Sequence, residues 1–152
     1  MIGFRLGNLL KPHSVVCLYG ELGAGKTIFI KGIAQALGFS DRDITSASFT
    51  IIAEYDSAIP LYHIDLYRLE KDTDIDETGI WDYIYGDGIT VIEWAERLGE
   101  IQADFISVKF AIIGKETRDI RIEGIDEKNW NRIEGGEDRT GRDIKRFPAV
   151  AE

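Results

Sequence analysis

The feature that most constrains the fold of this chain is one octapeptide, Gly20-Glu21-Leu22-Gly23-Ala24-Gly25-Lys26-Thr27. It fits the phosphate-binding loop pattern G-x-x-x-x-G-K-[ST] at every fixed position. In such a loop the backbone N–H groups point at phosphate oxygens, the lysine reaches the β- and γ-phosphates, and the final hydroxyl ligates Mg2+. The octapeptide therefore predicts that the chain binds a nucleoside triphosphate.

The residues on either side of the octapeptide provide the context that this motif needs. Residues 15–19 are short and largely apolar and are expected to form a strand. Residues 28–37 place apolar side chains at helical spacing, and Gly38 follows where a helix C-terminal glycine belongs. A strand, a glycine loop and a helix in this order distinguish a phosphate-binding loop from an accidental glycine-rich turn.

The rest of the chain predicts an α/β domain. Strands are expected at 48–55, 61–67, 89–94, 105–113 and 119–123, and short helices at 2–10, at 77–85 and from 129 onward. The first two of these strands form one antiparallel hairpin, and the last two form another. We expect a three-layer P-loop NTPase fold whose mostly parallel central sheet is extended by these hairpins. A single domain is predicted at 1–134, followed by a charged, flexible tail at 135–152.

Composition narrows the possible partners. The net charge is −9, whereas a protein that grips nucleic acid by itself carries a basic face. No apolar run approaches the roughly 20 residues of a membrane span, and the N-terminus does not resemble a signal peptide. The single cysteine, Cys17, lies in the first predicted strand, where a buried and inert thiol is expected. These features predict a cytoplasmic protein that has no membrane partner and binds no nucleic acid on its own.

Acidic residues at predicted strand ends are candidates for catalysis. Phosphate-loop enzymes place a carboxylate near Mg2+, commonly at the end of a neighbouring parallel strand. Glu93 ends an apolar predicted strand and is the leading candidate, either holding Mg2+ through water or orienting the attacking water. Asp65 is weaker by itself, because an acid on an edge strand often only faces solvent. His63 is more typical of packing or hydrogen bonding than of a metal ligand, and Trp94 fits either the core or a wall of the site.

A second motif bears on the choice of base. Asp76-Glu77-Thr78-Gly79 fits the D-x-x-G pattern of guanine-nucleotide switches. That pattern follows an apolar strand, whereas Asp72-Thr73-Asp74-Ile75 precedes it here, and the guanine-reading N/T-K-x-D motif is missing. Adenine is therefore the predicted base.

Several separated motifs together resemble one family, the TsaE (YjeE-type) ATPases. The phosphate loop is followed by Ser46-Ala47-Ser48-Phe49-Thr50, by His63-Ile64-Asp65-Leu66-Tyr67-Arg68 and by Ile92-Glu93-Trp94-Ala95-Glu96-Arg97. Their order and spacing match the family over residues 3–123. The resemblance implies ATP hydrolysis that resets the TsaD–TsaB complex during formation of threonylcarbamoyladenosine (t6A37) in tRNA. TsaC makes the group that this complex transfers, and tRNA is met only through the complex.

The resemblance also implies roles around the phosphates. Glu21 to Thr27 would hold the triphosphate of ATP, with Thr27 and Glu93 at the Mg2+. Asp65 would be the acid near the metal and the attacking water. Lys26, Asp65 and Glu93 would together carry the catalysis.

Two further roles are implied for residues outside the phosphate loop. Ser48 belongs to the switch-like segment 46–50, which would sense the γ-phosphate. The family usually has S-P-T-F there, and the loss of proline frees the preceding serine from its bias toward extended conformations. The family also usually has I-E-W-P at the position of Ile92-Glu93-Trp94-Ala95, so an alanine replaces the proline here. Arg118 resembles the family's arginine near the adenine. Gly3 matches a glycine just past a threonine-containing segment close to the nucleotide, so we expect an N-terminally short chain with altered base binding.

Two other functions are compatible with a phosphate-binding loop. A small-molecule kinase would need an acceptor pocket and an arginine-bearing lid, and the sequence has no arginine-rich helical insertion. A non-catalytic, nucleotide-gated binding module would respond to ATP without releasing phosphate. Acceptor phosphorylation and phosphate release distinguish these alternatives from an ATPase.

Overall fold

The computed structural model describes residues 1–40, 42–44, 51–70, 74–132 and 147–148. Its helices are α1 (Ile2–Gly7), α2 (Lys26–Ala36), α3 (Ile80–Ile84) and α4 (Glu127–Arg132), with 3-10 turns η1 (Ile75–Thr78) and η2 (Ala95–Arg97). Its strands are β1 (Val15–Tyr19), β2 (Ile52–Tyr55), β3 (Leu61–Asp65), β4 (Ile89–Glu93), β5 (Ile106–Ile112), β6 (Arg118–Glu123) and β7 (Phe147–Pro148).

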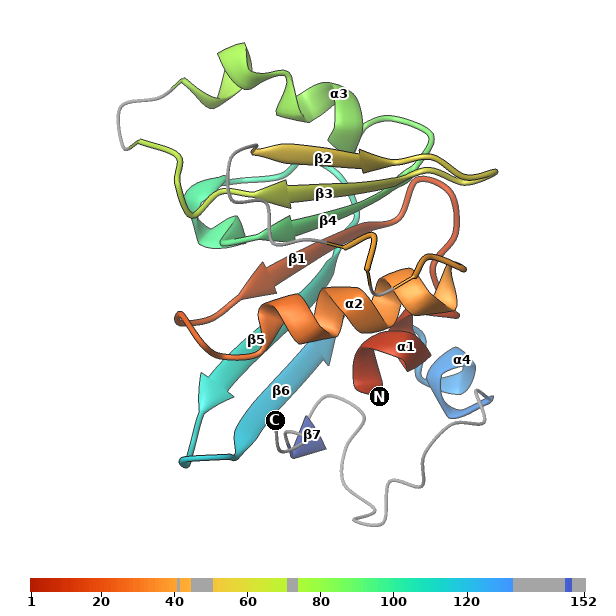
Figure 1. The fold of residues 1–152 in the computed structure, drawn as a ribbon, viewed down its shortest axis with the longest axis vertical. Helices are drawn as coiled ribbons and strands as arrows, with labels where there is room; N and C mark the ends of the chain where they lie inside the picture. The colour runs from red at the N-terminus through yellow and green to blue at the C-terminus, as the bar shows by residue number, and fades with distance from the viewer. Residues whose placement is uncertain (41, 45–50, 71–73, 133–146, 149–152) are drawn as a thin grey trace.

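The strands form one sheet in the order β2-β3-β4-β1-β5-β6-β7 (Figure 1). At its centre β3, β4, β1 and β5 run parallel to one another. β2 pairs with β3 in the antiparallel direction, and β6 and β7 extend the opposite edge from β5 in the same manner. The predicted mostly parallel sheet with antiparallel hairpin extensions is therefore confirmed.

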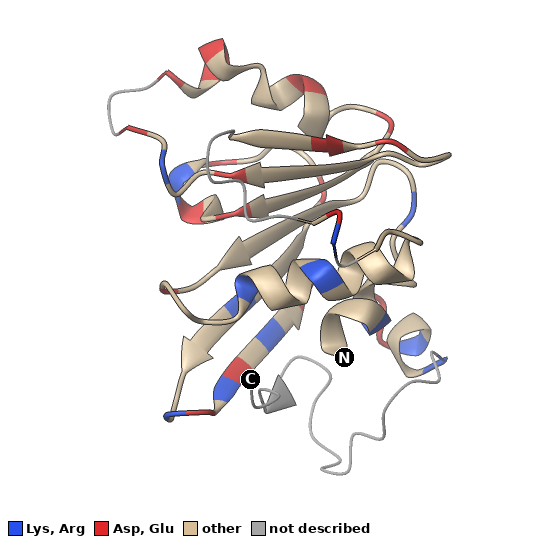
Figure 2. Cartoon of the chain, viewed as in Figure 1, with Lys and Arg blue, Asp and Glu red and all other residues tan. Residues whose placement is uncertain are grey.

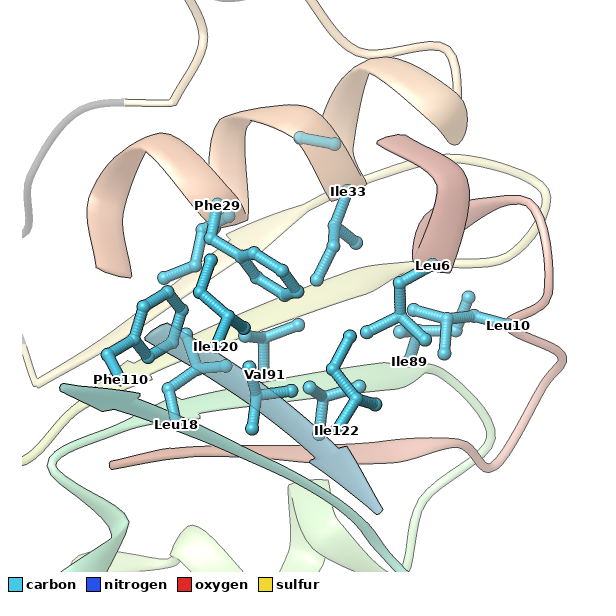
Figure 3. Packing of buried hydrophobic residues seen from close by; sticks show 14 of the residues in the cluster. Leu6, Leu10, Leu18, Phe29, Ile33, Ile89, Val91, Phe110, Ile120 and Ile122 are labelled. Carbon is cyan, nitrogen blue, oxygen red and sulfur yellow. The ribbon is translucent and has the colours of Figure 1, made fainter. Parts of the chain in front are cut away.

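Helices cover both faces of the sheet and give the three layers. In β1, Val16 and Leu18 face one core, whereas Val15 and Cys17 face the other. α1 and α2 supply the first core, where Leu6 and Phe29 pack toward the sheet (Figure 3). α3 supplies the second core. A parallel strand buried on both faces is apolar throughout, which explains the continuous apolar character of β1.

The thiol of Cys17 lies fully inside the second core and forms no disulfide. Burial raises the pKa of this thiol to about 12. The sulfur is therefore protonated at neutral pH, and a thiol in that state is a poor nucleophile. The predicted burial of this cysteine is confirmed.

Some elements differ in extent from the sequence-based expectation, for local reasons. The helix predicted at 77–85 is divided at Gly79, whose φ of 76° ends η1 before α3 begins. β3 ends at Asp65, where Oδ1 accepts a 3.0 Å hydrogen bond from the Tyr67 N–H and turns the chain. Residues 48–50 of the first predicted hairpin strand lie outside the described part of the chain.

α4 belongs to the first core even though it comes late in the chain. Its Trp130 is 1% exposed and packs with residues of α1, α2 and the sheet. Arg5 of α1 donates a 2.7 Å hydrogen bond to the Trp130 carbonyl, and its guanidinium lies 4.4 Å from the centre of the indole ring. The core of the domain therefore extends at least to α4.

We expect Trp130→Ala to lower the free energy of unfolding by about 3–5 kcal/mol, because truncating a large buried side chain leaves a cavity. Asn131→Ala is the matched control, since Asn131 is exposed on the same helix. It should change the free energy of unfolding by less than about 0.5 kcal/mol. Urea unfolding followed by circular dichroism measures both variants. A loss below about 1 kcal/mol for Trp130→Ala would contradict a core role for α4.

The C-terminal boundary of the domain stays a prediction. β7 falls inside the predicted tail and pairs with β6, and the other residues of that tail lie outside the described ranges. Among the residues that the structure describes, no helix has the length and apolar character needed to cross a membrane.

Candidate functional site

The predicted phosphate loop joins the end of β1 to the start of α2. Gly25 is the N-cap of α2 and has a left-handed backbone conformation, with φ of 99°. Gly20 also has a positive φ, and a Cβ at this position would lie 2.9 Å from the carbonyl oxygen of Phe110. Both positions favour glycine for local reasons. Because α2 begins at Lys26, the unpaired N–H groups and the positive dipole end of its first turn belong to the loop.

Lys26 lies folded against its own loop. The residue is 5% exposed, and Nζ donates hydrogen bonds of 2.5 Å to the Gly20 carbonyl and 2.9 Å to the Glu21 carbonyl. Nζ also lies 4.0 Å from the centre of the Trp94 ring. Burial lowers the pKa of the Lys26 ammonium, and nearby carboxylates, Glu93 foremost, oppose this shift. The ammonium is thus held at the loop with acidic groups around it.

The register of the parallel strands brings the two predicted acids to the same edge as the loop. Asp65 at the end of β3 is paired with Glu93 at the end of β4, and Glu93 is paired with Leu18 of β1. Figure 2 shows acidic residues at the ends of β3 and β4. Glu93 is 5% exposed, and Asp65 is half-buried. Burial raises the pKa of Asp65, the Tyr67 N–H lowers it, and the Glu93 carboxylate raises it further.

His63 contacts Glu93 inside the protein. Its Nε2 lies 2.7 Å from Oε2 of Glu93, and His63 has no exposed surface. The interpretation of His63 as a packing or hydrogen-bonding residue is therefore confirmed. The alternation along β3 indicated that His63 shares a face with Asp65, but its contact with Glu93 depends on the pairing of β3 with β4.

Aromatic and cationic side chains form a wall beside Lys26. The sequence was compatible with Trp94 either in the core or in a wall of the site. Trp94 has a left-handed backbone conformation, with φ of 57°, and its ring lies against the Lys26 ammonium. The Tyr67 ring lies 5.0 Å from the Trp94 ring, centre to centre. Arg97 donates from Nη1 to the carbonyls of Leu66, Tyr67 and Leu69, at 3.1, 2.5 and 3.1 Å.

The role of Arg97 was missed by the sequence reasoning. Arg97 follows β4, whereas the carbonyls that it binds follow β3. The contact arises because these two strands are neighbours, and no local pattern in the sequence indicates it. Arg97 ties the segment after Asp65 to the segment after Glu93.

Arg118, predicted near the base, lies against the phosphate loop. Its Nη2 donates a 3.1 Å hydrogen bond to the Gly23 carbonyl, and its Nη1 donates to the carbonyls of Gly114 and Thr117. The side chain is 9% exposed. Arg118 therefore joins the tip of the β5–β6 hairpin to the loop.

The remaining predicted residues are placed as follows. Thr27 lies in the first turn of α2 and is partly buried. Ser48 lies outside the described residues. Asp76 of the discounted D-x-x-G motif accepts a 2.7 Å hydrogen bond from the Trp81 indole, which gives it a local structural role. Within the described ranges, no group of three or more His, Cys, Asp and Glu residues is arranged to hold a metal by itself.

A cleft of about 530 Å³ lies at the other end of β1 from the loop. Its lining includes Lys11, His13, Val15, Phe105 and Ile106. Since β1 begins at Val15 and the phosphate loop follows Tyr19, this cleft is separate from the predicted nucleotide site.

The sequence of this chain is similar to those of proteins of one family. The family model described as "Threonylcarbamoyl adenosine biosynthesis protein TsaE" matches residues 1–122. The tRNA threonylcarbamoyladenosine biosynthesis protein TsaE of Treponema pallidum (strain Nichols) is 40% identical over 121 residues, which are 79% of this chain and 89% of the relative. The protein of the same name from Bacillus subtilis (strain 168) is 38% identical over 117 residues, 76% of this chain and 72% of the relative.

A solved structure is similar in both sequence and fold. The crystal structure of Bacillus subtilis YdiB is 39% identical, superposes with a TM-score of 0.54, and covers 73% of this chain and 69% of its own. This likeness and the family match over residues 1–122 identify the fold and the family of the chain. The chain belongs to the TsaE family.

Proposed function

We propose that the protein is a Mg2+-dependent ATPase that resets a TsaD–TsaB-like complex during formation of t6A37 in tRNA. The observation that carries this proposal is the meeting of Lys26, Asp65 and Glu93 at the loop edge of the sheet. Membership of the TsaE family supports the pathway, because its relatives are named for tRNA threonylcarbamoyladenosine biosynthesis.

The residues at the loop edge have the chemistry that Mg2+ and a triphosphate require. Mg2+ prefers hard oxygen ligands and keeps several waters, so one hydroxyl and one carboxylate suffice beside substrate phosphates. We assign Thr27 and Glu93 to the metal, which would neutralise charge on the phosphates when bound. The backbone N–H groups of residues 21–27 would bind the β- and γ-phosphates together with the Lys26 ammonium.

Asp65 and Glu93 would together orient the attacking water and the metal. Of two carboxylates at neighbouring strand ends, one can lie beside the metal while the other accepts a hydrogen bond from the attacking water. The raised pKa of Asp65 fits an acid that holds or takes a proton more readily than an exposed carboxylate. Ser48 would report the γ-phosphate, and Arg118 would complete the side of the loop nearest the adenine.

The direct partner would be protein, with tRNA met through the assembly. A net charge of −9 disfavours binding of this protein alone to the phosphate backbone of tRNA. A cytoplasmic location follows from this proposal, since the pathway modifies tRNA.

Phosphate release with and without a TsaD–TsaB complex tests the function. We expect slow hydrolysis of ATP by the protein alone and stimulation of at least about 10-fold by the complex, which is within the range of coupling between partner sites. Free phosphate should appear, and no phosphorylated acceptor. Absence of both stimulation and complex formation would contradict the proposal, as would transfer of phosphate to a small-molecule acceptor. Omission of Mg2+ should abolish the activity.

A further inference from the structure

A buried histidine of β3 contacts the carboxylate of Glu93 at the end of β4. His63 has no exposed surface, and its Nε2 lies 2.7 Å from Oε2 of Glu93, which is itself 5% exposed. In the parallel register of β3 and β4, His63 is paired with Val91, whereas Asp65 is paired with Glu93. His63 therefore lies further from the C-terminal ends of the strands than Glu93 does, whereas the phosphate loop follows the C-terminal end of β1.

The hydrogen bond defines how the imidazole ring is used. An ionised carboxylate only accepts hydrogen bonds, so Nε2 must carry the proton that is donated to Glu93. Nδ1 has no hydrogen-bond partner among the residues that the structure describes. Among the described residues, the polar contact that orients the ring is thus the one to Glu93, and the same contact restricts the rotation of the carboxylate.

Packing alone is a poor explanation for a histidine at this position. His63 shares its sheet face with Leu61 on its own strand and is level with Val91 on the next, and both belong to the first core. A leucine would bury similar apolar surface there without burying two polar ring nitrogens. Burying polar groups has a free-energy cost, so a specific polar role is the better explanation of a buried imidazole.

We propose that His63 is a positioning residue that holds the Glu93 carboxylate in the orientation used at Mg2+, an inference that rests on the proposed function. The bond to Oε2 fixes one carboxylate oxygen from the core side. The second oxygen then stays available for the metal or its water. Removal of such an outer partner commonly reduces metal affinity or activity by about 10–100-fold.

The contact itself can be tested without nucleotide or metal. The chain has two histidines, so a His13→Gln variant assigns the imidazole nitrogen signals of His63 in 15N-labelled protein. We expect Nε2 to be protonated and its signal to move in Glu93→Gln but not in Glu100→Gln, a control at an exposed acid. A His63 ring protonated only at Nδ1, or signals that do not respond to Glu93→Gln, would overturn the inference.

Three substitutions then separate positioning from packing. The amide nitrogen of His63→Gln can replace Nε2, that of His63→Asn replaces Nδ1, and His63→Leu keeps volume without a donor. With folding verified by thermal melting, kcat should stay within about threefold in His63→Gln and fall about 10–100-fold in His63→Asn and His63→Leu. ATP affinity in EDTA should stay within about threefold in all of them, because the loop is untouched.

Two results of this series would overturn the proposal. One is wild-type hydrolysis by His63→Leu, and the other is a loss in His63→Gln as large as in the other two variants. If the wild-type protein itself hydrolyses no ATP, the proposed function fails, and the Mg2+ concentration needed for tight ATP binding becomes the readout. That concentration should rise about 10–100-fold in His63→Asn and His63→Leu, and an unchanged value would overturn the positioning role.

Discussion

Replacing Lys26 with alanine should lower the affinity for Mg2+–ATP by about 100-fold or more, because each lost hydrogen bond to a charged group is worth about 1.5–3 kcal/mol. The ammonium already lies at the loop, held by the carbonyls of Gly20 and Glu21. Its charge also lowers the pKa of Asp65, so its removal should raise that pKa further. Titration calorimetry with ATP and Mg2+ measures the loss directly.

The matched control for this variant is Lys31→Ala. Lys31 belongs to the same helix, and its side chain is partly exposed. Its removal should change the ATP affinity by less than about threefold, since the charge is away from the phosphates and screened by solvent. Wild-type ATP affinity in Lys26→Ala, in protein that melts normally, would contradict the nucleotide site.

Replacing Glu93 with glutamine should leave ATP binding within about fivefold and lower kcat by about 100-fold or more, the usual contribution of a positioned acid or base. The amide oxygen of glutamine still accepts the hydrogen bond from His63 Nε2, so the variant removes charge with little loss of shape. Phosphate release under saturating ATP, with the partner complex present, measures kcat.

The control for the Glu93 variant is Glu100→Gln, an exposed acid after η2. It should hydrolyse ATP at the wild-type rate. If Glu93→Gln binds ATP much more weakly but keeps the wild-type kcat at saturating ATP, Glu93 supports the structure of the loop and does not take part in hydrolysis. Normal turnover in Glu93→Gln would contradict its assignment to the metal or the water.

Features that depend on a few consecutive residues could be predicted from the sequence. The octapeptide 20–27 indicated the loop because its glycines meet local backbone requirements, as the positive φ angles of Gly20 and Gly25 demonstrate. The apolar segment 15–19 indicated a strand, and the structure shows that this strand is buried on both faces. Both hairpins followed from strand-like segments separated by short turns.

Contacts between distant segments could not be predicted in the same way. His63 and Glu93 are 30 positions apart in the chain, and their contact requires β3 beside β4 in one particular register. The hydrogen bonds of Arg97 to carbonyls after β3 have the same origin. Trp130 packs in the first core and contacts Arg5 near the other end of the chain, whereas its neighbourhood in the sequence indicated only a short helix.

The sequence by itself thus determined that the chain has a phosphate-binding loop, a mostly parallel sheet and acids at strand ends. It did so because backbone conformation and hydrophobic periodicity depend on short stretches of residues. The tertiary structure decided that Asp65 is paired with Glu93 at neighbouring strand ends, that His63 contacts Glu93 and that Lys26 lies against Trp94. Strand order and register depend on how the whole chain packs its two cores, and no local segment carries that information.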